Sequence, residues 1–425
     1  MKTAEVTRIT TINLAYGRGE ASLELPSENL LGVYLPKVVE AAQDEAQLIR
    51  AALAAPNGTR RLRDLAGRGK KVVIVTSDMT RPCPSARLFP FILEELAAAG
   101  VPDEDVTIVM ALGLHRPMTE AEIAEALSPQ ISSRFRVLNH DVNDTVRLGV
   151  TREGTPVEIF RPVVEADLRV CLGNVEFHYF AGYSGGAKAI FPGCASRAGV
   201  TANHAMMVRP GSGTGRLVGN PVRADIEEAA GMLGVDFVLN VVVDGDHRVV
   251  GAAAGDMIAA QRKGCELVAE RGVVKVLQQA DIVVASAGGY PKDVNLYQAQ
   301  KALDNAVYFG RKGGAVILLA ECPEGFGNRT FQEWIRSASS LADVLDRVRR
   351  EFALGGHKAA AIAAVAQRNN IYLVSGMADD DVRACMMTPF RGAQEAFDAA
   401  LEEMGPQSRV AVLPQAGSVV AEVVE

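Results

Sequence analysis

The stretch from Gly173 to His204 is rich in residues whose side chains can do chemistry. It contains His178, Lys188 and His204 together with several glycines. A histidine can act as an acid, a base or a ligand near neutral pH, and an unprotonated lysine amine is a nucleophile. Glycines let a backbone come close to a bound molecule. The stretch therefore predicts a site that combines an acid or base, a ligand and an amine.

Reactive side chains also follow other predicted strands. Asp78 and Arg81 come after VVIVT, His115 after TIVMALG, His178 after RVCLGNVEF and Lys292 after DIVVASAGG. In α/β folds the carboxyl ends of parallel strands face the ligand. A single loop histidine is commonly an incidental polar residue, so one such strand end would mean little. Three of them in one sheet predict an active site.

The remaining histidines carry less weight. His140 and His247 lie in polar sequences, LNHDVND and DGDH, and are expected to be ordinary turn residues. His357 follows paired glycines that allow close backbone approach, which keeps it as a weak candidate.

Alternating strand and helix patterns must position these residues. KKVVIVTSD, DVTIVMALG and DLRVCLGNV are typical of buried strands, and TEAEIAEAL of a helix that Thr119 caps with Glu122. Successive strand and helix units imply a parallel sheet. We expect two α/β domains with largely parallel sheets, residues 1–272 and 273–425. The final strand, about 408–417, is expected either to close the second sheet or to return to the first domain.

Composition restricts the class of protein. The 425 residues are 48% hydrophobic and 22% charged, as in ordinary globular proteins. No apolar run approaches the ~20 residues that a membrane-spanning helix needs. The six cysteines are scattered, and the net charge of -7 comes without a basic stripe. We expect a reduced, cytoplasmic protein that binds neither nucleic acid nor membrane.

The glycine segment leaves two other functions open. Gly182, Ser184 and Gly186 fit the G-x-S-x-G pattern of serine hydrolases, so a hydrolase that uses Ser184 is the main alternative. The preceding strand ends well before Ser184, which disagrees with the sharp strand-to-helix turn of that motif. The P-loop and zinc signatures are absent. A non-catalytic protein that binds a small ligand is the second alternative.

A helix in the second half presents a polar face. Tyr297, Gln298 and Lys301 recur at helical spacing, and the opposite face, with Leu296 and Leu303 on it, is apolar. Such a helix is a plausible clamp for a carboxylate.

Together these motifs resemble the nickel-dependent lactate racemases and their relatives. The resemblance covers most of the chain and rests on SDMTRP, GLHRPMT, FHYFAGYSGGAKAIFPG, NHAM and YQAQKALDNA, in that order. It implies two α/β domains with the active site between them. It also implies nickel and a nickel-pincer nucleotide, pyridinium-3,5-bisthiocarboxylic acid mononucleotide, and hence biosynthetic enzymes that supply it.

The resemblance assigns a role to each matching residue. His115 and His178 correspond to the acid/base pair, His204 to the nickel ligand, and Lys188 to a lysine that can bond covalently to the cofactor. The other cofactor contacts it implies are Asp78, Met79, Thr80, Arg81, Tyr183, Ser184, Gly185 and Gly186, and the substrate contacts are Arg81, Tyr297, Gln298 and Lys301.

The implied reaction inverts C2 of a 2-hydroxy acid, lactate or a related compound. An imidazole is too weak a base to remove the C2 hydrogen as a proton, whereas hydride transfer to the cofactor avoids that step. One histidine then takes the hydroxyl proton, and two histidines on opposite sides give each enantiomer a base.

Overall fold

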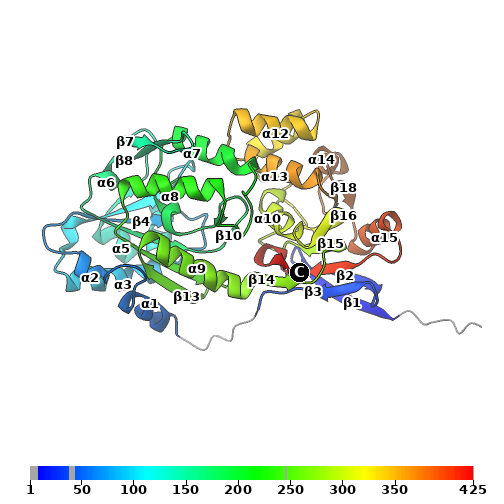
Figure 1. Cartoon of the computed structure of the whole chain (residues 1–425), viewed down its shortest axis with the longest axis horizontal. Coiled ribbons are helices and arrows are strands. Elements are labelled where there is room, and N and C mark those ends of the chain that lie inside the picture. Colours follow the sequence, from blue (N-terminus) through cyan, green and yellow to red (C-terminus); the bar gives the residue numbers. More distant parts are fainter. Residues whose placement is uncertain (1–7, 38–43, 245–246, 425) are drawn as a thin grey trace, which may run out of the picture. The chain divides into compact units, whose positions relative to one another are not determined.

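The computed structural model describes residues 8–37, 44–244 and 247–424. It divides into two compact units (Figure 1). The central unit comprises residues 39–270, and the terminal unit combines residues 1–38 with residues 271–425. Across the described residues, no helix is both long and apolar enough to span a membrane.

The expected assignment of the first residues to the N-terminal domain is wrong. Strand β3 (Leu30–Val33) pairs in parallel with β19 (Val410–Leu413) at the edge of the terminal unit's sheet. The hairpin of β1 (Ile9–Tyr16) and β2 (Gly19–Pro26) buries Leu14, Leu23 and Leu25 in the same core. The first strands therefore belong to the terminal unit. The chain then forms the central unit and returns to the terminal unit at Arg271.

The central unit contains a six-stranded sheet that positions the candidate residues. Its order is β13-β12-β9-β4-β5-β6, and all neighbours are parallel except β12 and β13. The strands are β4 (Val72–Ser77), β5 (Val106–Ala111), β6 (Arg136–Asn139), β9 (Leu168–Asn174), β12 (Phe237–Val243) and β13 (Val249–Gly255). The chain runs outward from β4 to β5 and β6, and later from β9 to β12. The switch point lies between β4 and β9, where open α/β sheets bind ligands.

Both faces of this sheet are covered, which explains its nearly continuous apolar strands. In β4, Val72 and Ile74 pack into one core, and Val73 and Val75 pack into the other. The first core includes residues of α1 (Glu45–Ala54), α2 (Leu62–Leu65), α3 (Ser85–Ala98), α4 (Glu120–Leu127) and α5 (Pro129–Arg134). The second includes residues of β8 (Pro156–Phe160), α6 (Arg161–Val164), α7 (Arg197–Ala205), α8 (Pro221–Leu233) and α9 (Met257–Gly272).

Side-chain caps mark the first residues of α4 and α8. Thr119 accepts a hydrogen bond from the Glu122 N–H while the Glu122 carboxylate accepts one from the Thr119 N–H, so the predicted capping box of α4 is confirmed. Asn220 caps α8 in front of Pro221. Two antiparallel pairs complete the unit: β7 (Thr145–Val150) with β8, and β10 (Phe177–His178) with β11 (Gly182–Tyr183).

The terminal unit contains a second six-stranded sheet, which is parallel throughout. Its order is β18-β17-β16-β15-β19-β3. Its further strands are β15 (Ala280–Ser286), β16 (Gly310–Leu319), β17 (Asn370–Val374) and β18 (Thr388–Phe390). Its helices are α10 (Leu296–Ala306), α11 (Arg329–Ser337), α12 (Leu341–Arg350), α13 (Gly356–Ala366), α14 (Asp379–Ala384) and α15 (Ala393–Met404).

The last strands remain in the terminal unit. β19 pairs with β15, and β20 (Val420–Val423) pairs with β14 (Val273–Val276). Of the two expected positions for the final strand, the structure has the one that extends the second sheet. The expected fold class of two α/β units with mostly parallel sheets is confirmed.

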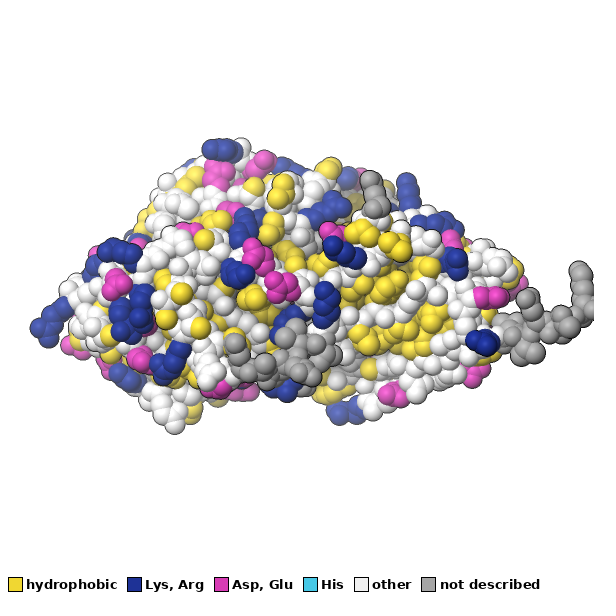
Figure 2. Space-filling view, turned by 60° about the horizontal axis from the view of Figure 1, so that its bottom comes forward, with side chains coloured by type: hydrophobic (Ala, Val, Ile, Leu, Met, Phe, Trp, Pro, Cys, Tyr) yellow, Lys and Arg dark blue, Asp and Glu magenta, His cyan; other side chains and the backbone are white. Residues whose placement is uncertain are grey.

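Charges of both signs lie near one another on the face of the molecule drawn in Figure 2. Figure 2 shows Lys and Arg side chains interspersed with Asp and Glu on one face, beside an area where hydrophobic side chains gather. The exposed large hydrophobic residues include Val33, Leu35, Leu277 and Val423 of the terminal unit.

Candidate functional site

The ends of β4 and β5 form an acid–histidine pair. Asp78 Oδ2 lies 2.5 Å from His115 Nδ1, with the Asp78 side chain 5% exposed and the His115 side chain 28% exposed. The His115 loop is tied to the glycine stretch, because the Gly113 N–H donates to the Gly193 carbonyl at 2.9 Å. Asp78 and His115 are separated by 37 positions in the sequence, and the neighbouring parallel strands bring them into contact.

The second Asp78 oxygen is held by the turn that follows. Oδ1 accepts hydrogen bonds from the Thr80 N–H at 3.0 Å and from Thr80 Oγ1 at 2.6 Å. Burial alone would raise the pKa of Asp78, but the hydrogen bonds from His115 and Thr80 outweigh it and keep the pKa below its ordinary value. An ionised carboxylate only accepts, so Nδ1 of His115 carries a proton and the lone pair of the neutral ring is on Nε2.

His178 and Lys188 form a second pair beyond the end of β9. Lys188 Nζ lies 3.4 Å from His178 Nε2, and the Ala181 N–H donates to His178 Nδ1 at 3.3 Å. Because Nδ1 accepts, a neutral His178 carries its proton on Nε2, facing the lysine. Nζ can accept that proton only as an unprotonated amine.

The surroundings favour that neutral state of both groups. Burial lowers the pKa of Lys188 well below its ordinary value, and the charges of Arg223 and Arg81 lower it further. Burial also lowers the pKa of His178, and Lys188 and Arg81 act in the same direction. These effects favour the neutral amine of Lys188, which is the nucleophilic form of a lysine side chain.

Arg223 holds the loop that carries this pair. It is 1% exposed on α8, and it donates to the backbone carbonyls of Ala181, at 3.2 Å, and Tyr183. Burial lowers its pKa to about 10, which still leaves it charged at neutral pH. A fixed buried cation under the loop thus supports both the loop conformation and the neutral lysine.

Phe180 is the common contact of three candidate residues. Its ring is edge-on to His178 with centroids 4.5 Å apart, and its centroid lies 5.0 Å from that of His204. Lys188 Nζ stands 5.7 Å from the same ring. Phe180 is 3% exposed, so the three residues surround one buried aromatic group. Sequence reasoning missed Phe180, Arg223 and Asn203, since buried supporting residues carry no motif of their own.

His204 lies in the last turn of α7. Its Nδ1 is 3.1 Å from Asn203 Oδ1. No group of three or more His, Cys, Asp or Glu residues within the described parts of the chain is arranged to hold a metal ion. Binding of a metal by His204 stays a prediction.

The residues Tyr183 to Gly186 have structural reasons for their identity. Ser184 Oγ donates to the Asn174 carbonyl and accepts from the Glu176 N–H, both at 2.9 Å. A Cβ on Gly186 would lie 2.7 Å from the Gln261 side chain, and one on Gly185 would lie 2.8 Å from Val175. Both glycines also have positive φ, 59° and 75°. Their role as cofactor contacts stays a prediction.

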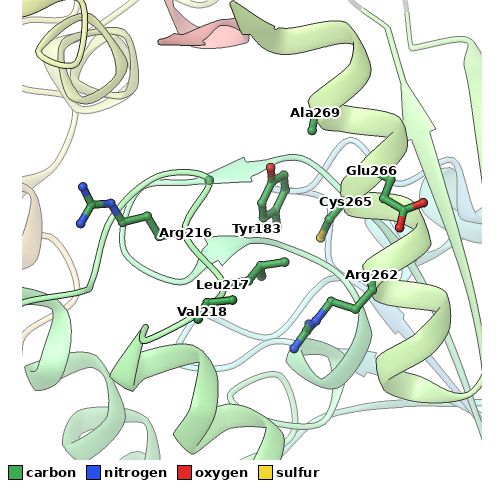
Figure 3. A pocket seen from close by; sticks show the side chains of 9 residues that line it. Tyr183, Arg216, Leu217, Val218, Arg262, Cys265, Glu266 and Ala269 are labelled. Atoms are coloured by element: carbon green, nitrogen blue, oxygen red, sulfur yellow. The ribbon is translucent and has the colours of Figure 1, made fainter. Parts of the chain in front are cut away.

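Tyr183 points into a shallow surface hollow instead of toward His178. Its ring packs against Phe177 at 5.3 Å, and because side chains alternate along a strand, His178 lies on the opposite face of the hairpin. Figure 3 shows Tyr183 between the loop with Leu217 and Val218 and the helix α9 with Arg262, Cys265, Glu266 and Ala269. This hollow is therefore separate from the acid/base residues.

Two other residues of the SDMTRP motif face solvent. Arg81 is exposed, and Met79 is 50% exposed. The charge of Arg81 lowers the pKa of Asp78, of His178 and of Lys188, so it acts on both pairs. Arg81 thus supplies positive charge to the site.

The substrate contacts predicted from the second half lie in the terminal unit. On α10, Gln298 and Lys301 are exposed and Tyr297 is partly exposed, while Leu296 and Leu303 are buried, so the predicted amphipathic helix is confirmed. His357 packs near Tyr297, with centroids 6.3 Å apart. Lys292 is also exposed in this unit. Contact of these residues with a substrate stays a prediction.

Comparison with known proteins agrees with the motifs. Residues 16–215 match the lactate racemase N-terminal domain, and residues 275–421 match the lactate racemase C-terminal domain. The lactate racemase of Thermoanaerobacterium thermosaccharolyticum is 34% identical over 424 residues, covering 97% of this chain and 99% of that protein. The lactate racemase of Lactiplantibacillus plantarum is 30% identical, covering 96% and 98%.

Solved structures show the same fold. The lactate racemase apoprotein from T. thermosaccharolyticum superposes with a TM-score of 0.90 at 34% identity, covering 97% of this chain and 100% of that chain. A protein from Thermotoga maritima shares the fold at a TM-score of 0.65 and 20% identity, covering 92% of this chain and 100% of that chain. Together, the two domain matches and the nearly full-length relatives show that the chain belongs to the lactate racemase family of enzymes.

Proposed function

We propose that this enzyme racemises lactate or a closely related 2-hydroxy acid by reversible hydride transfer. The observation that carries the proposal is the presence of two histidines with different fixed partners, Asp78 for His115 and Lys188 for His178. The family relationship supports the substrate class, because both named relatives are lactate racemases.

The residues fit nickel and the nickel-pincer nucleotide. The neutral amine of Lys188 suits a covalent link to a thiocarboxylate arm, and imidazole is a suitable ligand for nickel. His204 has its ring oriented by Asn203. A cofactor that brings its own donor atoms also agrees with the lack of a metal-binding cluster among the described His, Cys, Asp and Glu residues. When bound, the cofactor supplies an electrophilic carbon that accepts hydride from C2 and returns it.

The protein's own residues then handle the protons. The lone pair on Nε2 of His115 can accept the hydroxyl proton of one enantiomer, while Asp78 holds the proton on Nδ1. Burial, with the charge of Arg81, lowers the pKa of His178 and so favours its neutral ring. To act as the base for the other enantiomer, that ring must take the tautomer with its proton on Nδ1, which frees the Nε2 lone pair. Arg81 offers a charge-assisted hydrogen bond to the substrate carboxylate, and we propose that Tyr297, Gln298 and Lys301 complete its binding.

The geometry gives little support to a serine hydrolase. Ser184 is 8% exposed, and its hydroxyl donates to a backbone carbonyl. A serine nucleophile instead donates to a base such as histidine. No described contact favours the alternative of a non-catalytic binding protein. The tautomer of His115 that Asp78 fixes is instead a feature of acid/base catalysis.

Isotope transfer tests the proposed mechanism. The protein is produced in a host that has the cofactor's biosynthetic enzymes, and its nickel content and intact mass are measured. Lactate deuterated at C2 is then racemised in ordinary water. We expect the deuterium to be retained, because hydrogen that leaves as hydride never becomes an exchangeable proton, and we expect slower turnover if C–H cleavage limits the rate. Complete loss of deuterium to solvent would exclude hydride transfer.

The same preparation tests the cofactor. We expect nickel and an added mass that disappears in Lys188→Ala if the link is covalent. Protein without nickel and without long-wavelength absorbance would refute the cofactor assignment. Labelling of Ser184 by a fluorophosphonate would instead support the hydrolase. We also propose a cytoplasmic location, because a reducing compartment suits the six free cysteines.

A further inference from the structure

Behind His204 lies a buried polar network that the reaction does not use directly. Asn203, Asp225 and Thr151 are 0%, 1% and 4% exposed. Asn203 Nδ2 donates to Asp225 Oδ2 at 2.8 Å and to the Val222 carbonyl at 3.2 Å. Asp225 Oδ1 accepts from Thr151 Oγ1 at 2.5 Å, and Thr151 Oγ1 accepts from the Thr155 N–H at 3.1 Å.

This network leaves Asn203 only one amide orientation. A carboxylate and a backbone carbonyl can only accept, so the amide must turn its nitrogen toward Asp225 and Val222. Oδ1 then faces His204 Nδ1 at 3.1 Å. Because an amide oxygen can only accept, Nδ1 carries a proton, and the lone pair of the neutral ring is on Nε2.

We propose that Asn203 and Asp225 are positioning residues that fix His204 as an Nε2 ligand. Metal-binding histidines need this kind of partner on the other ring nitrogen, which fixes both the tautomer and the ring orientation. The usual partner is a carboxylate or a backbone carbonyl. Here the carboxylate acts through an intervening amide, so His204 is oriented without a negative charge in direct contact with its ring.

The inference rests on the proposed function only for the identity of the metal. The tautomer of His204 is a property of the protein alone and can be measured without nickel. Loss of the orienting partner of a metal ligand typically lowers metal affinity about 10- to 100-fold.

Nuclear magnetic resonance of 15N-histidine-labelled, metal-free protein at pH 8.5 tests the tautomer, with His204→Gln to assign the signal. We expect wild-type His204 to be protonated on Nδ1 and Asn203→Leu to lose this preference. Thr151→Val is the matched control, because it removes a distant donor and leaves the Asn203 amide in place; its tautomer is expected to be unchanged. If Asn203→Leu does not fold, Asn203→Ser replaces it, since its hydroxyl is too short to contact both His204 and Asp225.

Nickel retention in protein made with the cofactor is the second measurement. Under a chelator, we expect nickel to leave Asn203→Leu about 10- to 100-fold faster than wild type, and Thr151→Val to stay within a few-fold. Wild-type His204 protonated on Nε2 would overturn the inference, as would an Asn203→Leu protein with an unchanged tautomer and unchanged nickel release. Wild-type protein that takes up no nickel but shows the expected tautomers would refute the proposed function and leave the positioning role intact.

Discussion

Replacing Asp78 by asparagine should invert the tautomer of His115. Oδ1 of Asp78 accepts two hydrogen bonds from Thr80, at 2.6 Å and 3.0 Å, and these donors will hold the amide oxygen of an asparagine in the same place. The amide nitrogen must then occupy the position that faces His115 Nδ1. As a donor, it forces the lone pair onto Nδ1 and the proton onto Nε2, so Nε2 can no longer act as a base.

The expected loss follows from the interaction removed. A hydrogen bond to a charged group contributes about 1.5–3 kcal/mol, and each 1.4 kcal/mol of barrier is about tenfold in rate. Asp78→Asn should therefore reduce kcat at least roughly 10- to 150-fold in both directions of racemisation. Where such a change inverts the tautomer of a catalytic histidine, the loss approaches about 10⁴-fold.

The assay is racemisation of L- and D-lactate by protein made with the cofactor, with rates expressed per bound nickel. Asp103→Asn is the matched control. It makes the same carboxylate-to-amide change at an exposed ion pair with Arg134, outside the site, so kcat should stay within a few-fold of wild type. An Asp78→Asn enzyme that retains nickel and turns over within threefold of wild type would show that Asp78 does not orient the base.

Two further predictions follow from the pKa shifts. Lys188 is expected to be an unprotonated amine at neutral pH, so cyanate should carbamylate it faster than exposed Lys301 in cofactor-free protein at pH 7. The masses of the modified peptides measure both rates. Equal rates would contradict the neutral state of Lys188. His140 is 4% exposed, and burial lowers its pKa from 6.5 to about 4. Between pH 6.5 and 4 the His140 ring is therefore protonated in the unfolded chain but not in the folded protein. The free energy of unfolding falls as the pH drops through that window, and this residue contributes about 3 kcal/mol to the fall. Urea unfolding at pH 7 and pH 4.5 should show a smaller decrease in His140→Leu than in wild type, and an equal decrease in both would refute the argument.

Strand ends were the part of the site most accessible from the sequence. The motifs after β4, β5 and β9 carry Asp78, His115 and His178, and these strands are neighbours in the sheet. A parallel sheet must bring its carboxyl ends to one edge, so the residue types and their places after apolar runs were sufficient. The contact between Asp78 and His115 was not predictable, because it depends on the order of strands across the sheet.

Other features depend on packing that a local pattern does not encode. The alternation in β1 and β2 predicts strands with one buried face, but it does not tell which core receives Leu14 and Leu23. The run FQEWIRSASSLADVLDRVRREF is not one helix, because α11 ends at Ser337 and Ser340 caps a second helix, α12, after a break. His140 stands in a polar sequence yet is buried, edge-on to Phe160 with centroids 5.6 Å apart.

The positions of the two bases along the sheet agree with the chemistry proposed for them. His115 follows β5 and takes its partner Asp78 from the end of β4, whereas His178, Lys188 and His204 all come after β9. The two groups therefore arise from opposite sides of the switch point between β4 and β9. A two-base racemase needs its bases on different sides of the substrate, and histidines that follow different strands suit that need. In this sheet the strand order places the proposed bases after different strands, while the hydrogen bond from the Gly113 N–H to the Gly193 carbonyl joins the His115 loop to the stretch that carries His178 and Lys188.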